Sequence, residues 1–348
     1  MAERAKNNYE EYYEDLKAIG NGAFGIVYKG KEKGKDELRA IKVINLEKMK
    51  ENIINEYGTD LKKQLKLCID GFMTEFENMK ICSLNNENSV KCYEYFNNED
   101  NFTIIMELCD TNLSTVLTKR VEKNGKGFNS EEILEILNQL NNAFKVMKEN
   151  KIIHRDLKLE NILIKYKDKE HKKYIIKLSD YGSSKRLSSL TKNYLNSVNG
   201  TLLYMAPEIL KGEEYNYKCD LWSIGIIIYK LYFGKFPYFG ENESTIINKI
   251  EELGNKKLKE TDNKELDNLI KNLLKKDPSK RLTWDQYFNH SFFGTKSRNK
   301  INLIYECEKD GIWRIFGEKF VENNKNNIKL VINGIKSELV EKYELKKG

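Results

Sequence analysis

The chain has 348 residues, of which 40% are hydrophobic and 32% charged, and its net charge is +7. Lysines and acidic residues are interleaved along the sequence, so the surplus charge predicts a solvated surface and not a nucleic-acid-binding patch. The longest apolar run, residues 224–229, is far too short to cross a bilayer. None of the six cysteines forms a Cys-x-x-Cys pair and only three histidines occur, so no zinc site is expected. Free thiols and a polar N-terminus predict a cytoplasmic protein, with the nucleus as the alternative.

Strand patterns dominate the chain up to about residue 108. Four segments have the alternation or apolar composition of strands: residues 12–30, which hold two strands around a glycine turn, 38–46, 90–96 and 101–108. Between the second and third of them, residues 47–84 have helical spacing, with Phe72, Phe76 and Met79 on one face. The first third of the chain therefore predicts a small β-rich lobe that includes one helical region.

Helical patterns dominate from residue 109 onward. A helix is predicted to begin with Ser130 as its N-cap, and two more are predicted over residues 220–234 and about 263–275. A pair of strands is predicted around residues 162–178. A small strand-rich lobe followed by a larger helical lobe predicts an α+β fold with two lobes.

The last part of the chain has a different pattern. Residues 294–302 are polar and predict a linker. The Asn333-Gly334 pair lies between alternating apolar residues, which is the strongest short-range signal for a hairpin. Residues 303–348 therefore predict a small β-rich appendage.

A glycine motif lies between the first two predicted strands. Gly20, Gly22 and Gly25 form a G-x-G-x-x-G pattern, with Val27 two residues later. A turn between strands explains such a pattern about as often as a phosphate loop does. In a dinucleotide-binding oxidoreductase the pattern would open onto a helix, whereas here a strand follows Gly25. The context favours a hairpin loop whose backbone N–H groups approach nucleotide phosphates.

A lysine lies inside the third predicted strand. Lys42 follows Ala40 and Ile41 in an apolar segment, one strand after the glycine motif. A lysine that spans two phosphates needs such a rigid strand, and its partner should be a carboxylate on the following helix. Glu75 is the predicted partner, with Glu77 as the alternative.

Six polar residues crowd into eight positions of the segment IIHRDLKLENILI, residues 152–164. The flanking runs are apolar, and a core segment would not tolerate unpaired charges because burying a charge without a partner is costly. The segment therefore indicates a functional site. The tripeptide DYG at residues 180–182 and the tripeptide APE at residues 206–208 follow it.

Taken in order and spacing, these motifs resemble the eukaryotic protein kinases of the serine/threonine type across residues 13–294. The resemblance rests on the glycine loop, Lys42, HRDLKLEN, DYG, GTLLYMAPE, DLWSIG and DPSKRL. It implies a bilobal fold, with an N-lobe at about 13–108 and a C-lobe at about 109–294. Residues 1–12 would then be an N-terminal extension, and residues 303–348 an accessory module that could dock a partner.

The resemblance implies ATP and Mg²⁺ as cofactors and protein Ser/Thr hydroxyls as acceptors. Asp156 would accept or orient the hydroxyl proton, Lys158 would steady the transferring phosphate, and Asn161 and Asp180 would hold magnesium ions. The residues implied to contact ATP are Ile19, Gly20, Gly22, Gly25, Val27, Ala40, Lys42, Met106, Glu107, Cys109 and Leu163. The residues implied to have structural roles are Glu208, Asp220 and Arg281, with Glu208 and Arg281 as a buried ion pair.

The resemblance also implies the acceptor class and a mode of control. Lys158 and Thr201 match the serine/threonine class, and the likeness is greatest to calmodulin-dependent and autophagy-initiating kinases. Arg155 precedes the predicted catalytic Asp156, and such an arginine often needs a phosphate in the activation segment. Ser197 lies four residues before Thr201, at the common phosphosite, although it could instead be a solvated loop hydroxyl.

Three residues depart from the usual kinase pattern: Leu159, Tyr181 and Leu202. None replaces a catalytic group, but the hydroxyl of Tyr181 needs a hydrogen-bond partner. The alternative function is a pseudokinase scaffold that binds nucleotide and partners without efficient transfer. The intact Lys42 and Asp156 argue against that alternative.

Overall fold

The computed structural model describes residues 8–21, 25–57, 61–168, 173–181, 201–253, 258–294, 306–307 and 313–314. The chain divides into two compact units, Met1–His290 and Ser291–Gly348, and each unit is described by itself. Among the described helices, none combines the length and the apolar composition that a bilayer crossing requires.

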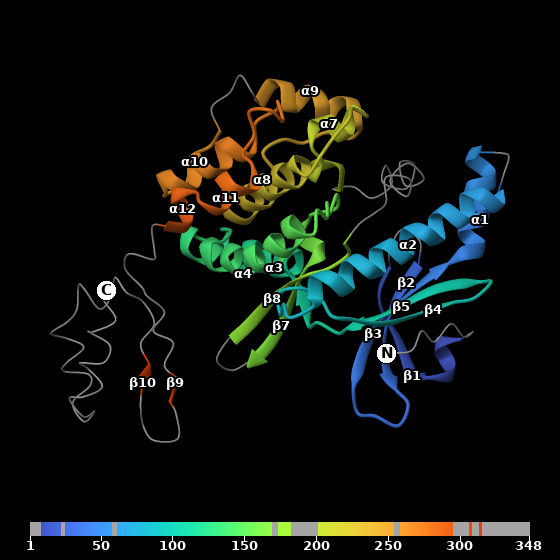
Figure 1. Cartoon of the computed structure of the whole chain (residues 1–348). Coiled ribbons are helices and arrows are strands. Elements are labelled where there is room, and N and C mark those ends of the chain that lie inside the picture. The colour runs from blue at the N-terminus through green and yellow to red at the C-terminus, as the bar shows by residue number, and fades with distance from the viewer. Residues whose placement is uncertain are drawn as a thin grey trace, which may run out of the picture. The chain divides into compact units, whose positions relative to one another are not determined.

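The first part of the larger unit is a five-stranded antiparallel sheet with the order β1-β2-β3-β5-β4 (Figure 1). Its strands are β1 (Tyr13–Asn21), β2 (Gly25–Glu32), β3 (Leu38–Asn45), β4 (Cys92–Asn97) and β5 (Asn101–Glu107). A short 3-10 helix, η1 (Tyr9–Glu11), precedes the sheet, and α1 (Leu46–Tyr57) and α2 (Leu61–Ser83) follow β3. All five predicted strands are present, and the predicted helical region comprises two helices.

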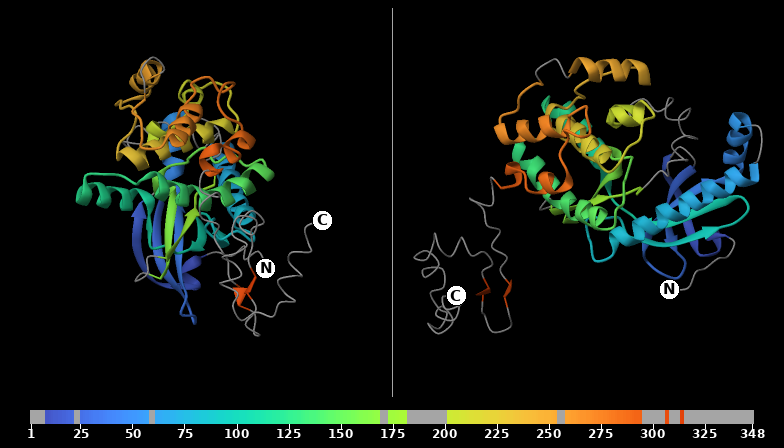
Figure 2. Two further views of the ribbon diagram at one scale, coloured as in Figure 1. Left: turned by 90° about the vertical axis from the view of Figure 1, so that its left-hand side faces the viewer. Right: turned by 45° about the horizontal axis from the view of Figure 1, so that its top comes forward.

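Helix α2 lies across one face of this sheet (Figures 1 and 2). Phe72 and Phe76 are buried, and their rings contact Phe102 and Tyr95 at centroid distances of 5.6 Å and 4.9 Å. Met79 is fully buried one turn later. The predicted apolar face of the helix is confirmed, and it fixes the rotation of α2 over the sheet.

The opposite face of the sheet is covered by the start of the chain. Successive side chains of a strand point to opposite faces, so Ile41 of β3 points away from its neighbour Lys42. Ile41 and Ile105 form a buried cluster with Tyr9 and Tyr13. The segment predicted as an extension therefore contributes Tyr9 to the core of the N-lobe, and the boundary at residue 13 stays a prediction.

The second part of the larger unit is mainly helical. Its helices are α3 (Leu113–Asn124), α4 (Ser130–Glu149), α7 (Pro207–Leu210), α8 (Lys218–Phe233), α9 (Glu243–Leu253), α10 (Lys264–Leu273) and α11 (Trp284–Phe288), with the 3-10 turns η2 (Leu159–Asn161) and η3 (Thr201–Tyr204). A small sheet contains β6 (Thr111–Asn112), β7 (Ile162–Asp168) and β8 (Lys173–Leu178). Twelve of the sixteen residues of α8 are buried, as expected for a helix that is apolar on all sides. The α+β fold with two lobes is confirmed.

The predicted N-cap of α4 was wrong by one residue. Asn129 is the N-cap, because its side chain accepts a hydrogen bond from the Glu132 backbone and the Glu132 side chain returns one. Ser130 already belongs to the helix, and its hydroxyl donates to Asp262. Both residue types cap helices well, so the backbone and the tertiary contact decided between them.

The smaller unit contains few described elements. These are α12 (Ser291–Gly294) and an antiparallel pair of two-residue strands, β9 (Glu306–Cys307) and β10 (Trp313–Arg314). The predicted Asn333-Gly334 hairpin and most of residues 303–348 lie outside the described residues. The accessory module therefore stays a prediction.

Candidate active site

Three charged side chains from separate elements meet at the ammonium group of Lys42. Lys42 lies on β3, and its Nζ is 2.8 Å from Glu75 Oε1 on α2. The same Nζ is 2.6 Å from Oδ1 of Asp180, which lies two residues beyond β8. Glu75 is buried, whereas the alternative Glu77 is exposed to solvent. The carboxylate that reaches Lys42 from α2 is therefore that of Glu75.

The charges of Lys42 and Asp180 stabilise each other, whereas burial and, more weakly, the charge of Asp180 raise the pKa of Glu75 against the opposing effect of Lys42. Burial alone would lower the pKa of Lys42, but the carboxylates of Asp180 and Glu75 more than offset it, and the pKa is raised. Burial alone would raise the pKa of Asp180, but Lys42 and, more weakly, Lys158 outweigh it, and the pKa is lowered. Lys42 and Asp180 are therefore both charged at neutral pH, which is the state that phosphate and metal binding require.

The segment between α4 and β7 brings Asp156, Lys158 and Asn161 together. Lys158 Nζ is 2.8 Å from Asp156 Oδ2. Asn161 Nδ2 donates to the same Oδ2 at 2.9 Å and to the Asp156 carbonyl oxygen at 2.8 Å. The Asp156 carboxylate is thus held from two sides. The amide nitrogen of Asn161 is occupied, while its amide oxygen accepts no hydrogen bond from any described residue.

The backbone of the same segment is fixed by a buried carboxylate. Asp220, on α8, is 1% exposed and accepts hydrogen bonds from the N–H groups of His154 at 2.8 Å and Arg155 at 2.9 Å. His154 is fully buried, and its Nε2 contacts the carbonyl oxygen of Ser179 at 2.9 Å. These contacts hold the backbone on both sides of the site in place.

Two residues beside the site have strained backbone conformations. Arg155 and Asp180 have φ values of 67° and 57°, in the left-handed region that residues with a side chain rarely adopt. Such a conformation costs about 1–3 kcal/mol and persists only where the surrounding contacts enforce it. The Asp220 hydrogen bond to Arg155 and the Lys42 ion pair with Asp180 are such contacts.

The hydroxyl of Tyr181 forms a hydrogen bond. Tyr181 is fully buried, and its hydroxyl shares a short hydrogen bond with Ser89 Oγ, in the connection between α2 and β4. Its carbonyl oxygen accepts a hydrogen bond from Asn78 Nδ2 of α2 at 3.4 Å. Ser89 lies 92 positions earlier in the chain, and no local sequence pattern marks it as the partner. The tyrosine therefore ties the segment after Asp180 to the end of α2.

We expect Tyr181→Phe to lower the free energy of unfolding by about 0.5–1.5 kcal/mol, because it removes this hydrogen bond and keeps the ring. Thermal unfolding of the single variant, of Ser89→Ala and of the double variant measures the coupling between them. The effect of the double variant should be smaller than the sum of the two single effects. Strictly additive effects would contradict the hydrogen bond.

The N-lobe residues implied to contact ATP lie around Lys42. Val27 pairs with Lys42 across β2 and β3, and Ala40 pairs with Met106 across β3 and β5. Ala40 and Lys42 are two residues apart on one strand, so their side chains share a face. A Cβ atom on Gly25 would lie 1.8 Å from the carbonyl oxygen of Val43, so no larger residue fits there.

The other implied ATP contacts are distributed over both lobes. Ile19 and Gly20 are exposed on β1, and Gly22 lies outside the described residues. Glu107 ends β5 and is buried, and Leu163 lies on β7. Cys109 is half-buried and follows β5, and burial raises the pKa of its thiol to about 12, so the thiol is neutral.

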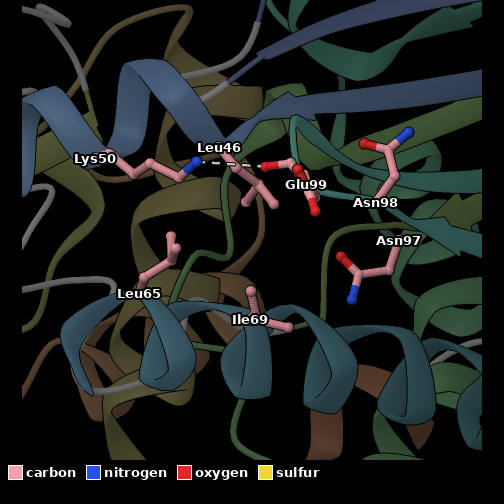
Figure 3. Close-up of a pocket in the computed structure, with 7 residues that line it drawn as sticks. All are labelled: Leu46, Lys50, Leu65, Ile69, Asn97, Asn98 and Glu99. Atoms are coloured by element: carbon pink, nitrogen blue, oxygen red, sulfur yellow. Dashed lines mark hydrogen bonds between the residues drawn. The ribbon is translucent and has the colours of Figure 1, made fainter. Parts of the chain in front are cut away.

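An open cavity of about 420 Å³ lies elsewhere in the N-lobe (Figure 3). It is lined by Leu46, Lys50, Leu65, Ile69, Asn97, Asn98 and Glu99. Lys50 Nζ reaches the Glu99 carbonyl oxygen across it, at 3.4 Å. None of the residues implied to contact ATP lines this cavity, so it is separate from the candidate site.

The predicted ion pair between Glu208 and Arg281 is present and buried. Arg281 NH1 is 2.6 Å from Glu208 Oε1, and NH2 is 3.0 Å from Oε2. The two side chains are 0% and 3% exposed. Arg281 also donates to the carbonyl oxygens of Lys275 and Lys218. This pair joins the APE segment to the loop after α10, away from the Lys42 cluster.

The residues with implied regulatory roles are less completely described. Thr201 is buried at the start of η3, and the Arg155 guanidinium lies 5.7 Å from the centre of the Tyr215 ring. Ser197 lies outside the described residues. The roles assigned to these three residues stay predictions.

Residues 13–293 match the model of the protein kinase domain. The chain belongs to the protein kinase family. Its matched relatives include the serine/threonine-protein kinases TIO of Arabidopsis thaliana, 30% identical, and atg1 of Dictyostelium discoideum, 32% identical. Both relatives are named as serine/threonine-protein kinases, the class to which the sequence motifs are similar.

The matches cover very different fractions of the relatives' own sequences. Each match to TIO and atg1 covers 81% of this chain, but only 19% and 39% of those proteins. Myosin light chain kinase A of Dictyostelium discoideum is 30% identical over 92% of this chain and 98% of its own length. The kinase domain of this chain is therefore similar to the kinase domains of proteins that differ in total length.

Proposed function

We propose that this kinase is catalytically active and transfers the γ-phosphate of ATP to serine or threonine hydroxyls of proteins. The observation that carries the proposal is the Asp156 carboxylate, held by Lys158 and Asn161 in the same unit as the Lys42–Asp180 pair. A pseudokinase scaffold would need the nucleotide-binding residues but no positioned proton acceptor. These five charged or polar groups, arranged for transfer, therefore favour the active enzyme.

The donor groups fit ATP and magnesium. Lys42 supplies a fixed cation for phosphate oxygens on a rigid strand. The carboxylate of Asp180 and the amide oxygen of Asn161 are hard oxygen donors, the type that Mg²⁺ prefers. Bound magnesium would neutralise charge on the phosphates, while Glu75 keeps Lys42 oriented toward them.

The remaining groups act on the acceptor. In this proposal Asp156 accepts or orients the hydroxyl proton of the protein substrate, and Lys158 steadies the transferring phosphate. Phosphoryl transfer depends on positioning and charge neutralisation more than on covalent catalysis. Asn161 Nδ2 donates one hydrogen bond to the Asp156 carboxylate and one to the Asp156 carbonyl oxygen. The carboxylate is therefore held before the substrate arrives, which lowers the reorganisation that transfer requires.

We expect Asp180→Asn to lower transfer by about 10²–10³-fold, because one preorganised charge is lost from the phosphate site. Initial rates should be measured over a titration of Mg²⁺, and chelation of magnesium should abolish the wild-type rate. The variant should need more Mg²⁺ for half-maximal activity. An unchanged magnesium dependence would contradict the assigned role of Asp180.

We propose that residues 303–348 dock a partner protein, because they lie beyond the family match at residues 13–293. Truncation after residue 300 should abolish binding of that partner and leave activity on a generic peptide within about twofold. Pull-down from native lysate and steady-state kinetics measure the two effects. A large loss of thermal stability or of basal activity would instead show that the tail braces the kinase domain.

A further inference from the structure

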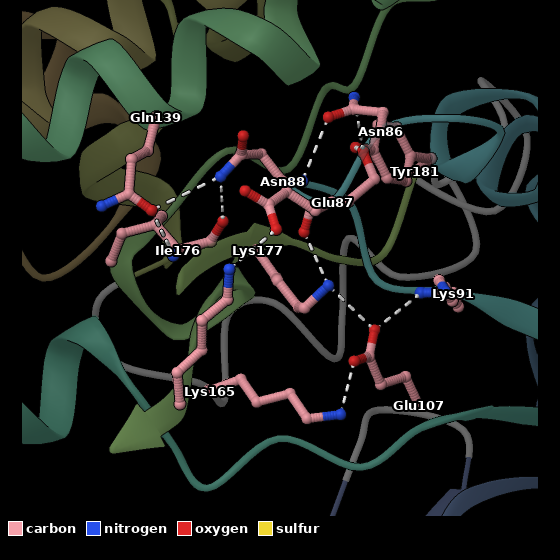
Figure 4. Close-up of polar contacts among 12 residues, drawn as sticks. Asn86, Glu87, Asn88, Lys91, Glu107, Gln139, Lys165, Ile176, Lys177 and Tyr181 are labelled. Carbon is pink, nitrogen blue, oxygen red and sulfur yellow. Dashed lines mark hydrogen bonds and ion pairs between the residues drawn. The ribbon is translucent and has the colours of Figure 1, made fainter. Parts of the chain in front are cut away.

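A second group of buried charges lies where β5 ends (Figure 4). Glu107 is 7% exposed, and its Oε2 is 3.0 Å from Lys177 Nζ and 3.3 Å from the backbone nitrogen of Lys91. Its Oε1 is 2.6 Å from Lys165 Nζ. Burial alone would raise the pKa of Glu107, but the two lysines outweigh it, and the pKa is lowered. The carboxylate is therefore ionised and paired.

The two lysines differ in their surroundings. Lys165, on β7, is 41% exposed and has Glu107 as its ion-pair partner. Lys177, on β8, is 3% exposed, and its Nζ also donates to the carbonyl oxygen of Glu87 at 2.6 Å. Lys177 thus joins β8 both to the end of β5 and to the connection between α2 and β4 (Figure 4).

The connection between α2 and β4 also forms hydrogen bonds with the residues of β8 on both sides of Lys177. The backbone N–H of Val90 donates to the Leu178 carbonyl oxygen, and that of Leu178 donates to the Asn88 carbonyl oxygen, each at 2.9 Å. The Asn88 side chain donates to the carbonyl oxygen of Ile176 at 2.9 Å. Lys177 therefore lies in the middle of the hydrogen bonds that join β8 to residues 87–90, and three residues before Asp180.

We propose that Lys177 is a positioning residue for the reaction, one that holds the end of β5 in register with β8 and so with Asp180. This inference rests on the proposed function. In that function ATP would bind next to the end of β5 and Asp180 would hold magnesium, so Lys177 would align the ATP site with Asp180. A buried ion pair contributes little net stability compared with an apolar pair, so its value here lies in fixing geometry. Displacement of reacting groups by about 1 Å can cost 10²-fold in rate.

The test compares Lys177→Met with Lys165→Met, which removes the exposed cation from the same carboxylate. We expect Lys177→Met to lower kcat/KM for ATP by about 10-fold to 10²-fold, at a temperature where the variant is folded. Lys165→Met should stay within twofold of wild type. Equal effects of the two variants would overturn the proposal.

A double variant separates positioning from stability. Lys177→Met alone removes one partner of the buried Glu107 carboxylate and should lower the melting temperature. Glu107→Gln/Lys177→Met removes both charges of the pair and should recover much of this loss. The proposal predicts that kcat/KM stays at least fivefold below wild type in this double variant. If activity returns together with the melting temperature, Lys177 serves stability alone and the proposal is wrong.

Two further measurements do not depend on phosphate transfer. Lys177→Met should weaken the binding of ATP measured by calorimetry, and it should speed hydrogen exchange of the backbone amides in β8 more than Lys165→Met does. A wild-type protein that transfers no phosphate would refute the proposed function, and these two measurements would still decide the role of Lys177. Unchanged exchange in β8 together with unchanged ATP affinity would overturn that role.

Discussion

Asp156→Asn is expected to lower the rate of phosphate transfer by about 10²–10⁴-fold, the range that a positioned proton acceptor contributes. Asparagine has nearly the same shape as aspartate, so it can keep hydrogen bonds to Lys158 and Asn161 while losing the negative charge. The expected loss therefore falls on kcat, with little change in KM for ATP. Steady-state kinetics over a range of ATP concentrations measure both values.

The control for this variant is Asp36→Asn, whose side chain is 99% exposed and pairs only with Lys31 among the described residues. It makes the same chemical change far from the Lys42 cluster in the fold and should leave kcat within twofold of wild type. Thermal unfolding should show both variants folded. Undiminished turnover in Asp156→Asn would refute the proposed role of this carboxylate.

Arg281→Ala is expected to lower the free energy of unfolding by about 3–5 kcal/mol, because it leaves the Glu208 carboxylate buried without its partner. Arg281 also donates to the Lys275 and Lys218 carbonyl oxygens, and those acceptors lose their donor as well. In a domain of this size the loss corresponds to a fall in melting temperature on the order of 10 °C. Calorimetry or circular dichroism measures this fall.

Lys148→Ala provides the comparison for an exposed pair. Lys148 Nζ is 2.5 Å from Asp285, with side chains 39% and 74% exposed, and such pairs contribute about 0–1 kcal/mol. The melting temperature of the Lys148→Ala variant should therefore stay within a few degrees of that of the wild type. A similar small shift in Arg281→Ala would mean that the Glu208–Arg281 pair does not carry the stability assigned to it.

The sequence was most informative where local pattern and chemistry coincide. Lys42 was recognisable because it lies inside an apolar strand, one strand after the glycine motif, and the helical region was recognisable from the spacing of Phe72, Phe76 and Met79. The sequence favoured Glu75 over Glu77, and the structure was needed to exclude Glu77, because both are close to the right position on the helix. Only the packing of that apolar face on the sheet turns Glu75 inward and leaves Glu77 in solvent.

Contacts between distant segments could not be predicted in the same way. Ser89 meets Tyr181, and Tyr9 enters the core of the N-lobe, because the tertiary fold brings them there. Lys177 is a different case, since it interrupts an apolar strand in the same way as Lys42. The apolar surroundings of Lys42 were therefore present at Lys177 as well, but no glycine motif precedes Lys177, and its partner Glu107 had to come from the structure.

The most direct test of the proposed activity is the transfer of radiolabel from γ-labelled ATP to a generic protein substrate, followed by phosphoamino acid analysis. The wild-type kinase should label serine or threonine in a Mg²⁺-dependent reaction, and Asp156→Asn, prepared in the same way, should reduce the label by about 10²–10⁴-fold. Wild-type labelling no greater than that of Asp156→Asn would contradict an active kinase and favour the pseudokinase scaffold.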